Sequence, residues 1–358
     1  MEAWIDTTDG LDALSRELLA APWVGLDTEA DSLYAYPEKL CLVQVSIPGL
    51  DALIDPLAGL ELAPLQQAFL AHRLILHGGD YDLRLLYRTR RFVPRAVFDT
   101  MLAARLLGSR EFGLERLVAR ILGVKLEKGP QRANWARRPL TPRMMAYARA
   151  DSHYLKPLAD HLSKELERHG RLDWHAEMCR RLIVDCTRES EIDPDTVWRL
   201  SGAHRLDRRG LAVLRELWHW RDQEARRLSR PPFFVLPHDT LVKLAENATR
   251  QAANQAVLRG LPSASIRARL AELIEEALAL PDSRLPPVRR STGVRLSLEQ
   301  RRYQERLESR RNRVAHDLGL EPSLVASRSM LVGLAGGKLD PERDLMSWQR
   351  RLLLDANP

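Results

Sequence analysis

Three short segments of the sequence carry acidic side chains in patterns that suit the binding of a divalent cation. The first is Gly25-Leu26-Asp27-Thr28-Glu29, at the end of an apolar run that predicts a strand from residue 24 to residue 29. Residues two apart on a strand face the same side of the sheet, so Asp27 and Glu29 are expected side by side. Adjacent carboxylates raise each other's pKa, and a bound cation relieves that repulsion.

The second segment is His77-Gly78-Gly79-Asp80-Tyr81-Asp82-Leu83, which connects a predicted strand (74–77) to a predicted helix (81–90). Its glycines let the backbone approach a neighbour closely, and a carboxylate in the first helical turn is favoured by the helix dipole. Asp80 and Asp82 are both candidates, either as a cation ligand or as a helix N-cap.

The third segment is Tyr147-Ala148-Arg149-Ala150-Asp151, in a helix expected to begin near Thr141-Pro142. A spacing of four places Tyr147 and Asp151 on one helix face, one turn apart. Carboxylate oxygens select hard cations, and a group of this size can hold two of them about 3.5–4 Å apart, as in-line phosphodiester hydrolysis requires. Tyrosine, with a pKa of about 10, is a poor base at neutral pH, so its expected role is to orient a water.

Other common reaction types lack their motifs. The 358 residues contain no Gly-x-x-x-x-Gly-Lys-Ser/Thr loop, Gly-x-Gly-x-x-Gly fingerprint, His-Glu-x-x-His or Gly-x-Ser-x-Gly sequence. The three cysteines suit neither a disulfide framework nor a thiolate zinc site, and no stretch is apolar for long enough to cross a membrane. We therefore expect a protein of the reducing cytoplasm that makes no use of a membrane.

The charge of the chain is uneven. Lys and Arg number 55 against 48 Asp and Glu, a formal net charge of +7. Between Leu285 and Ala315 nine Arg face three Glu, which concentrates most of the excess in one stretch. These arginines are at positions 289, 290, 295, 301, 302, 306, 310, 311 and 313. The stretch is typical of a segment that binds a polyanion, and it is equally typical of a solvated helix with internal ion pairs.

Apolar spacing predicts an α/β region followed by helices. The expected strands cover 24–29, 40–47, 52–54 and 74–77, and the expected helices cover 9–20, 65–70 and 81–90. Beyond Val97-Phe98 the pattern is helical almost to the end, which predicts a three-layer α/β domain and then all-α modules. Pro157 is expected to kink or end the helix that follows Asp151.

An internal repeat lies in the helical part. A shift of 90 residues aligns 221–245 with 311–335 and gives nine identities in 25 positions, including Pro232 with Pro322. The spacing indicates two copies of one unit, each with a charged helix, a proline-containing turn and a second helix. Chance agreement among Leu, Ala and Arg is the alternative.

The order of these motifs resembles the tyrosine-bearing branch of the DEDD superfamily of 3′-to-5′ exonucleases, and within it the bacterial ribonuclease D family. Further similar stretches are 40–46, 98–100 and Trp135-x2-Arg138-Pro139-Leu140-Thr141. The repeat is similar to a pair of the helical modules called HRDC. Gln44, Asp99 and Trp135 fall in these stretches, but strand packing, helix capping and core filling explain them equally well.

The resemblance implies an RNase H-like mixed sheet flanked by helices and two small HRDC-like helical domains. It implies an exonuclease domain at 1–205, helical domains at 206–283 and 297–358, and a Pro/Arg-rich linker at 284–296. It favours Asp82 over Asp80, because the aspartate that precedes leucine matches the family motif. Its implied ligands of two Mg²⁺ or Mn²⁺ ions are Asp27, Glu29, Asp82 and Asp151, with Tyr147 as the water-positioning group.

The implied activity is metal-dependent removal of nucleoside 5′-monophosphates from RNA 3′ ends. The implied substrates are tRNA precursors and other structured RNA with single-stranded 3′ ends. Two alternatives stay open: a DNA 3′-to-5′ exonuclease with the same site, and a non-catalytic RNA-binding scaffold.

Overall fold

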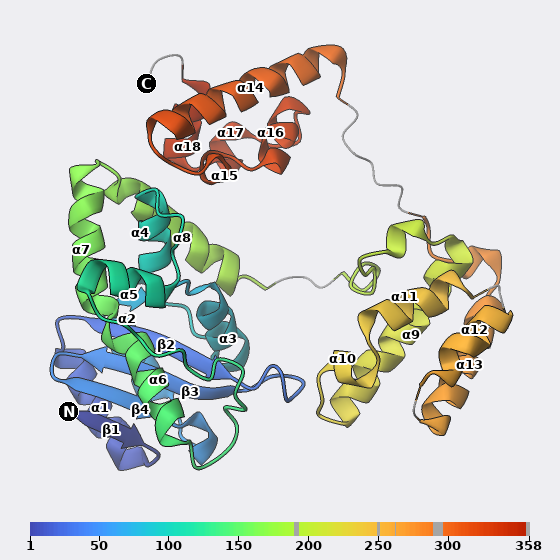
Figure 1. Ribbon diagram of the computed structural model, residues 1–358, viewed down its shortest axis with the longest axis horizontal. Helices are drawn as coiled ribbons and strands as arrows, with labels where there is room; N and C mark the ends of the chain where they lie inside the picture. Colours follow the sequence, from blue (N-terminus) through green and yellow to red (C-terminus); the bar gives the residue numbers. More distant parts are fainter. Residues whose placement is uncertain (190–192, 249–250, 262, 289–295, 356–358) are drawn as a thin grey trace. The chain divides into compact units, whose positions relative to one another are not determined.

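The computed structural model describes residues 1–189, 193–248, 251–261, 263–288 and 296–355. Contacts divide the chain into two units (Figure 1). Unit 1 comprises Met1–Asp31, Leu40–Arg188 and Val294–Pro358, and unit 2 comprises Ser32–Lys39 and Glu189–Gly293. Three of the arginines counted above, Arg289, Arg290 and Arg295, lie outside the described residues.

Within the described ranges, six strands form one mixed sheet in unit 1, in the order β1-β4-β3-β2-β5-β6. The strands are β1 (Glu2–Ile5), β2 (Val24–Ala30), β3 (Leu40–Ile47), β4 (Leu50–Ile54), β5 (Arg73–Leu76) and β6 (Ala96–Asp99). The central strand β2 is antiparallel to β3 and parallel to β5. The mixed sheet that the family resemblance implies is therefore confirmed, and the four strands predicted from apolar spacing agree with β2 to β5 within a few residues.

The edge strands β6 and β1 were not predicted, and β1 illustrates the reason. It is four residues long, pairs only with β4, and includes the exposed Glu2 together with the partly exposed Trp4. A short strand with one polar end has no clear alternation of apolar residues, so its pairing is visible only in three dimensions.

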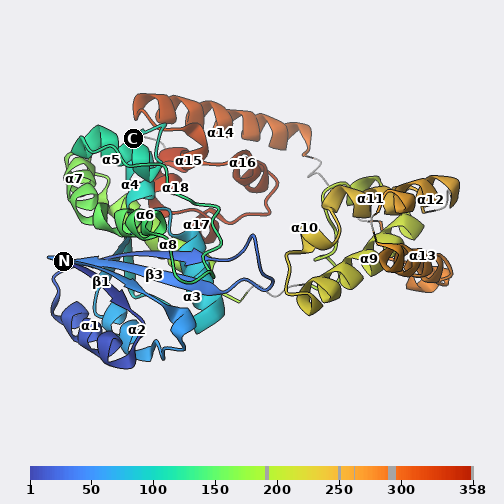
Figure 2. The same ribbon diagram turned by 60° about the horizontal axis from the view of Figure 1, so that its bottom comes forward.

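Helices cover both faces of the sheet. On one face α1 (Thr8–Ala20), α2 (Ala63–Leu70), α3 (Asp80–Arg90) and α8 (Leu172–Thr187) share a core with Val43 and Val45 of β3. On the other face lie α4 (Thr100–Leu106), α5 (Leu114–Leu122), α6 (Pro142–His153) and α7 (Leu155–Arg168). Figure 2 shows α6 on one side of the sheet and α1 and α2 on the other.

The helix α6 is fixed at both ends. Thr141 is its N-cap and accepts a hydrogen bond from the backbone N–H of Met144, with Pro142 in the first turn, as the sequence predicts. The helix ends at His153, and Pro157 lies in the first turn of α7, where a missing N–H costs little. The predicted interruption is therefore a break between two helices rather than a kink.

An ion pair joins the segment before α6 to the end of β4. The guanidinium of Arg138 donates to both carboxylate oxygens of Asp55 at 2.6 Å, and also to the carbonyl oxygen of Cys41 at 2.7 Å. The Asp55 side chain is only 7% exposed, so the pair lies in a poorly solvated place. It holds the entry to α6 against the sheet.

The internal repeat is confirmed by the helix bounds. In the first copy, α9 spans Arg208–Arg227 and α10 spans Pro232–Val235; in the second, α14 spans Leu298–Asp317 and α15 spans Pro322–Val325. Both pairs of bounds differ by 90. One side-chain bond is also repeated: Arg221 donates to the carbonyl of Leu236, and Arg311 donates to the carbonyl of Ala326.

The remaining helices complete the two modules. In unit 2 they are α11 (His238–Glu246), α12 (Gln251–Arg259) and α13 (Ala264–Leu278). In unit 1 they are α16 (Arg328–Ala335), α17 (Pro341–Asp344) and α18 (Ser347–Leu354).

The second module packs onto the sheet-bearing part of unit 1. The rings of Trp174 and Trp348 stack with centroids 4.8 Å apart, and Arg171 donates to the carbonyl oxygens of Leu106 and Leu318. Of the helices in the described ranges, none has both the length and the apolarity that crossing a bilayer needs.

The Arg138–Asp55 pair gives the first prediction. Changing Arg138 to Met leaves a buried carboxylate without its partner, so the free energy of unfolding should fall by about 3 kcal/mol. The measurement is urea unfolding followed by tryptophan fluorescence. Arg137→Met, at the exposed neighbouring position, is the matched control and should change little. Equal unfolding midpoints for the two variants would contradict the account.

Candidate active site

Two strand residues and one helix residue bring their carboxylates together on the α6 side of the sheet. Each of Asp27, Glu29 and Asp151 offers an oxygen that lies within 4.8 Å of the others. Asp27 and Glu29 share a face of β2 because they are two apart, and α6 packs against that face. The predicted pairing of Asp27 with Glu29, and their meeting with Asp151, are both found in the structure.

A glycine allows α6 to approach β2. A Cβ added to Gly25 would lie 3.0 Å from the carbonyl oxygen of Ser152 and close to the side chain of Leu155. A larger residue at this position would push the end of α6 outward. The hydroxyls of Ser152 and Ser46 lie 2.9 Å apart and add a direct bond between α6 and β3.

Asp82, in the first turn of α3, lies beside the edge of β2, near the other three carboxylates. Because β5 pairs with β2 only at Val24 and Gly25, the later backbone groups of β2 are left free on that side. The carboxylate of Asp82 accepts hydrogen bonds from the backbone N–H of Thr28 and from its hydroxyl, the latter at 2.5 Å. Asp82 is buried, and its charge acts on Asp27, Glu29 and Asp151.

Asp80 points elsewhere. Its carboxylate pairs with Arg84 at 3.1 Å and accepts from the thiol of Cys186, and its side chain is 60% exposed. We name four acidic residues the carboxylate cluster: three have oxygens within 4.8 Å of one another, and Asp82, which is outside that group of three, lies close enough for its charge to act on all of them. Its members are Asp27, Glu29, Asp82 and Asp151.

Burial and mutual repulsion disfavour the charged forms of the cluster. Burial raises the pKa of Glu29 to about 9, and the charges of Asp151 and Asp82 add to the effect. Burial and the three neighbouring carboxylates raise the pKa of Asp27 well above its usual value. The pKa of Asp151 rises to about 7, chiefly through burial, although the hydrogen bond from Tyr147 opposes the rise.

The residues of the cluster suit a divalent cation. Their donors are all carboxylate oxygens, which hard cations such as Mg²⁺ and Mn²⁺ prefer. Burial and like charges govern the pKa values of Asp27, Glu29 and Asp151, so among the described residues the negative charge of the cluster is strongly disfavoured. A cation would compensate that charge.

Tyr147 lies beside the cluster, and the segment that contains Gly129 and Gln131 covers it. Burial and the charge of Asp151 raise the pKa of its phenol, which therefore stays protonated at neutral pH; the hydroxyl donates to Asp151 and is hydrogen-bonded by Gln131. The backbone of Gly129 lies so close to the ring that a Cβ there would be 1.5 Å from it. A cavity of about 400 Å³ opens between this segment, the start of α5, Tyr147 and Asp151.

Several contributors were missed at the level of sequence. Thr28 holds Asp82, and Gly129 and Gln131 hold Tyr147. Asp99 caps α4 and also accepts from the backbone N–H of Gly79 at 2.8 Å, which fixes the turn that leads to Asp82. Of these, only Asp99 carried a sequence signal, as a helix N-cap.

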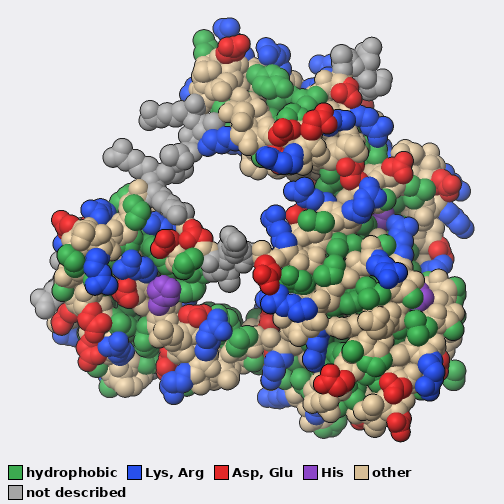
Figure 3. All heavy atoms as spheres, turned by 180° about the vertical axis from the view of Figure 1, so that it is seen from behind, with side chains coloured by type: hydrophobic (Ala, Val, Ile, Leu, Met, Phe, Trp, Pro, Cys, Tyr) green, Lys and Arg blue, Asp and Glu red, His purple; other side chains and the backbone are tan. Residues whose placement is uncertain are grey.

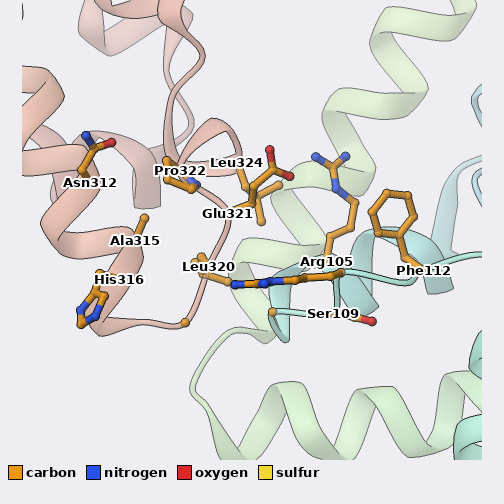
Figure 4. A pocket seen from close by; sticks show the side chains of 13 residues that line it. Arg105, Ser109, Phe112, Asn312, Ala315, His316, Leu320, Glu321, Pro322 and Leu324 are labelled. Atoms are coloured by element: carbon orange, nitrogen blue, oxygen red, sulfur yellow. The ribbon is translucent and has the colours of Figure 1, made fainter.

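A second, larger cavity of about 630 Å³ lies apart from the cluster in unit 1 (Figure 4). Arg105, Ser109 and Phe112 border it on one side, and Asn312, His316 and Glu321 border it on the other. No member of the carboxylate cluster lines it.

Comparison with known proteins agrees with this geometry. A family model described as a 3′-5′ exonuclease matches residues 3–167, and a model of the HRDC domain matches residues 210–276. Ribonuclease D of Gluconacetobacter diazotrophicus is 32% identical over 362 residues, covering 98% of this chain and 90% of that protein.

Solved structures give the same relationship. The crystal structure of Escherichia coli RNase D superposes with a TM-score of 0.76 at 28% identity, covering 98% of this chain and 96% of that one. The catalytic core of RRP6 from Trypanosoma brucei superposes with a TM-score of 0.68 at 26% identity, covering 78% and 81%. With the sheet, the helical modules and relatives matched over almost their whole length, the chain belongs to the ribonuclease D family.

Proposed function

We propose that the protein is a metal-dependent 3′-to-5′ exoribonuclease that releases nucleoside 5′-monophosphates from RNA 3′ ends. The observation that carries the proposal is the convergence of four carboxylates and a protonated phenol, beside a cavity, in a chain of the ribonuclease D family. The convergence of the carboxylates supports cation-assisted hydrolysis. Membership of the ribonuclease D family supports RNA as the substrate and 3′-to-5′ as the direction of degradation.

In this proposal Asp27, Glu29, Asp82 and Asp151 hold two divalent ions. When bound, such ions stabilise the charge that develops on the attacked phosphate and on the departing oxygen. The chain's own part is to keep the carboxylate oxygens in place. Thr28 does this for Asp82, the β2 pleat does it for Asp27 and Glu29, and the packing of α6 does it for Asp151.

Tyr147 is assigned to position the attacking water. A phenol that keeps its proton cannot act as a base at neutral pH, and because its O–H donates to Asp151, its oxygen meets a water as an acceptor. Gln131 and Asp151 hold its hydroxyl from two sides, and Gly129 leaves room for its ring. The phenol therefore presents a fixed polar group at the wall of the cavity.

The proposed substrates are tRNA precursors and other structured RNA with single-stranded 3′ ends, met in the cytoplasm. The E. coli relative is described as an exoribonuclease involved in structured RNA processing. The proposal assigns residues 1–205 to the exonuclease domain, 206–283 and 297–358 to the helical domains, and 284–296 to the linker.

Part of the attraction for RNA is assigned to α14. Arg302, Arg306 and Arg313 are exposed and spaced by four and seven residues, so they form a stripe along one side of this helix. By contrast, Arg310 and Arg311 donate to backbone carbonyls of the same module. On the face shown in Figure 3, basic side chains are spread among acidic and apolar ones over each unit.

The raised pKa values predict how the stability of the cation-free protein depends on pH. At a pH above the ordinary carboxyl pKa, the unfolded chain has lost protons that the folded cluster still binds. The free energy of unfolding therefore falls as the pH rises, until about pH 9, where Glu29 ionises. Urea midpoints in EDTA should therefore decrease from pH 5 to pH 9, and MgCl₂ should remove most of the decrease. Identical pH profiles with and without Mg²⁺ would contradict this.

Substitution in the cluster should stop hydrolysis. Asp27→Asn and Asp151→Asn should each lower kcat by about 10²–10³-fold, since each removes a charge that holds the ions. Tyr147→Phe should lower kcat by about 10²-fold through a misplaced water. Asp80→Asn, two residues from the cluster but facing away from it, is the matched control and should keep the wild-type rate.

The assay uses a 5′-labelled precursor tRNA with a 3′ trailer, in Mg²⁺, Mn²⁺ or EDTA, beside a DNA strand of the same sequence. A ladder that shortens from the 3′ end supports the proposal. Faster degradation of the DNA favours a DNA exonuclease, and chelator-insensitive binding without degradation in either metal favours a scaffold. Either of these two outcomes overturns the proposal.

The arginine stripe predicts the salt dependence of binding. Replacing Arg302, Arg306 and Arg313 with Gln should flatten the slope of log affinity against log salt by up to about 2, since each phosphate contact on a single strand contributes about 0.7. Hydrolysis of a dinucleotide should be unchanged. The control is the same replacement at the exposed Arg16, Arg90 and Arg95. Equal slopes in both triple variants would show that the arginines of α14 do not contact RNA phosphates.

A further inference from the structure

One buried amide beside the carboxylate cluster has no partner. Gln44 of β3 is 0% exposed, and neither its side-chain nitrogen nor its side-chain oxygen has a hydrogen-bond partner among the described residues. The sheet register places Gln44 directly opposite Asp27, so the two side chains leave the same face of the sheet as neighbours. That face is the one that α6 covers.

Packing does not account for an amide at this position. The neighbours of Gln44 on the same face are Leu42, two residues earlier on β3, and Leu53, opposite it on β4; both are buried in an apolar cluster with Ala148 of α6. A buried polar group without a hydrogen bond destabilises a fold, whereas an apolar side chain of similar volume would fit such surroundings without that cost. Something other than core filling therefore favours the amide.

The position of Gln44 fits a role toward Asp27. Side chains directly opposite on antiparallel strands have Cβ atoms about 4.5–5.5 Å apart, within reach of a glutamine amide. In the structure Asp27 is turned toward Glu29 and Asp151, and no bond joins it to Gln44. A carboxylate that binds a cation through one oxygen leaves the other free to accept from a donor, and such a donor fixes the ligand's orientation.

We propose that Gln44 is a positioning residue of the carboxylate cluster, whose amide N–H donates to the Asp27 carboxylate when divalent cations are bound. This inference rests on the proposed function. The amide is neutral, so it orients Asp27 without competing with the cations for the negative charge of the cluster. It acts through Asp27 and does not touch the substrate.

The test uses Gln44→Leu and Gln44→Met in the full chain, with Leu53→Met as the control for repacking of the same layer. Affinity for Mn²⁺ is measured by electron paramagnetic resonance of the free ion, kcat and KM are measured on labelled RNA, and the thermal midpoint is measured in EDTA. We expect both Gln44 variants to lose about tenfold or more in Mn²⁺ affinity and in kcat. The KM for RNA should be unchanged, and the midpoint in EDTA should be equal to or above that of wild type.

The opposite pattern would overturn the inference. Wild-type Mn²⁺ affinity and kcat in both Gln44 variants would show that the amide has no role toward the cluster. A lowered midpoint in EDTA, or failure of both variants to fold, would show that the amide supports the fold without cations. If the wild-type protein neither binds Mn²⁺ nor degrades RNA, the proposed function itself fails, which is a separate result.

Discussion

Repulsion among four carboxylates is the constraint on which the rest of the structure depends. The sheet, the edge of β2 and the helix α6 bring these groups together, and each step works against their charge. Burial raises the pKa values most and repulsion adds to the rise, so that the pKa of Glu29 reaches about 9. In a fold that keeps such a cluster, positive charge is strongly favoured at one site, and the binding of divalent cations requires such a site.

The supporting groups around the cluster are neutral. Thr28, Tyr147 and the amide opposite Asp27 can orient carboxylates by hydrogen bonds, yet none of them cancels negative charge. The ion pair of Arg138 with Asp55 lies at the end of β4 and anchors the entry to α6. This pair does not involve the cluster, and the charge of the cluster is available to cations and, in the proposed function, through them to RNA phosphates.

The sequence predicted what depends on short spacings. Strand alternation placed Asp27 beside Glu29, and a spacing of four placed Tyr147 beside Asp151. The 90-residue repeat was visible as nine identities in 25 positions, among them Arg221 and Arg311, which make the same bond to the backbone in both copies. Contacts between residues that are distant in the sequence were not predicted. They include the pairing of the edge strand β1, the approach of Gly25 to α6, and the bond from Thr28 to Asp82. Only the family motif, not spacing, separated Asp82 from Asp80.

The most direct test of the account is anomalous diffraction from crystals of the full chain soaked in MnCl₂. The account predicts two manganese peaks about 3.5–4 Å apart, both coordinated by oxygens of the carboxylate cluster. Manganese density only outside the cluster, or none at any concentration that supports RNA degradation, would contradict it.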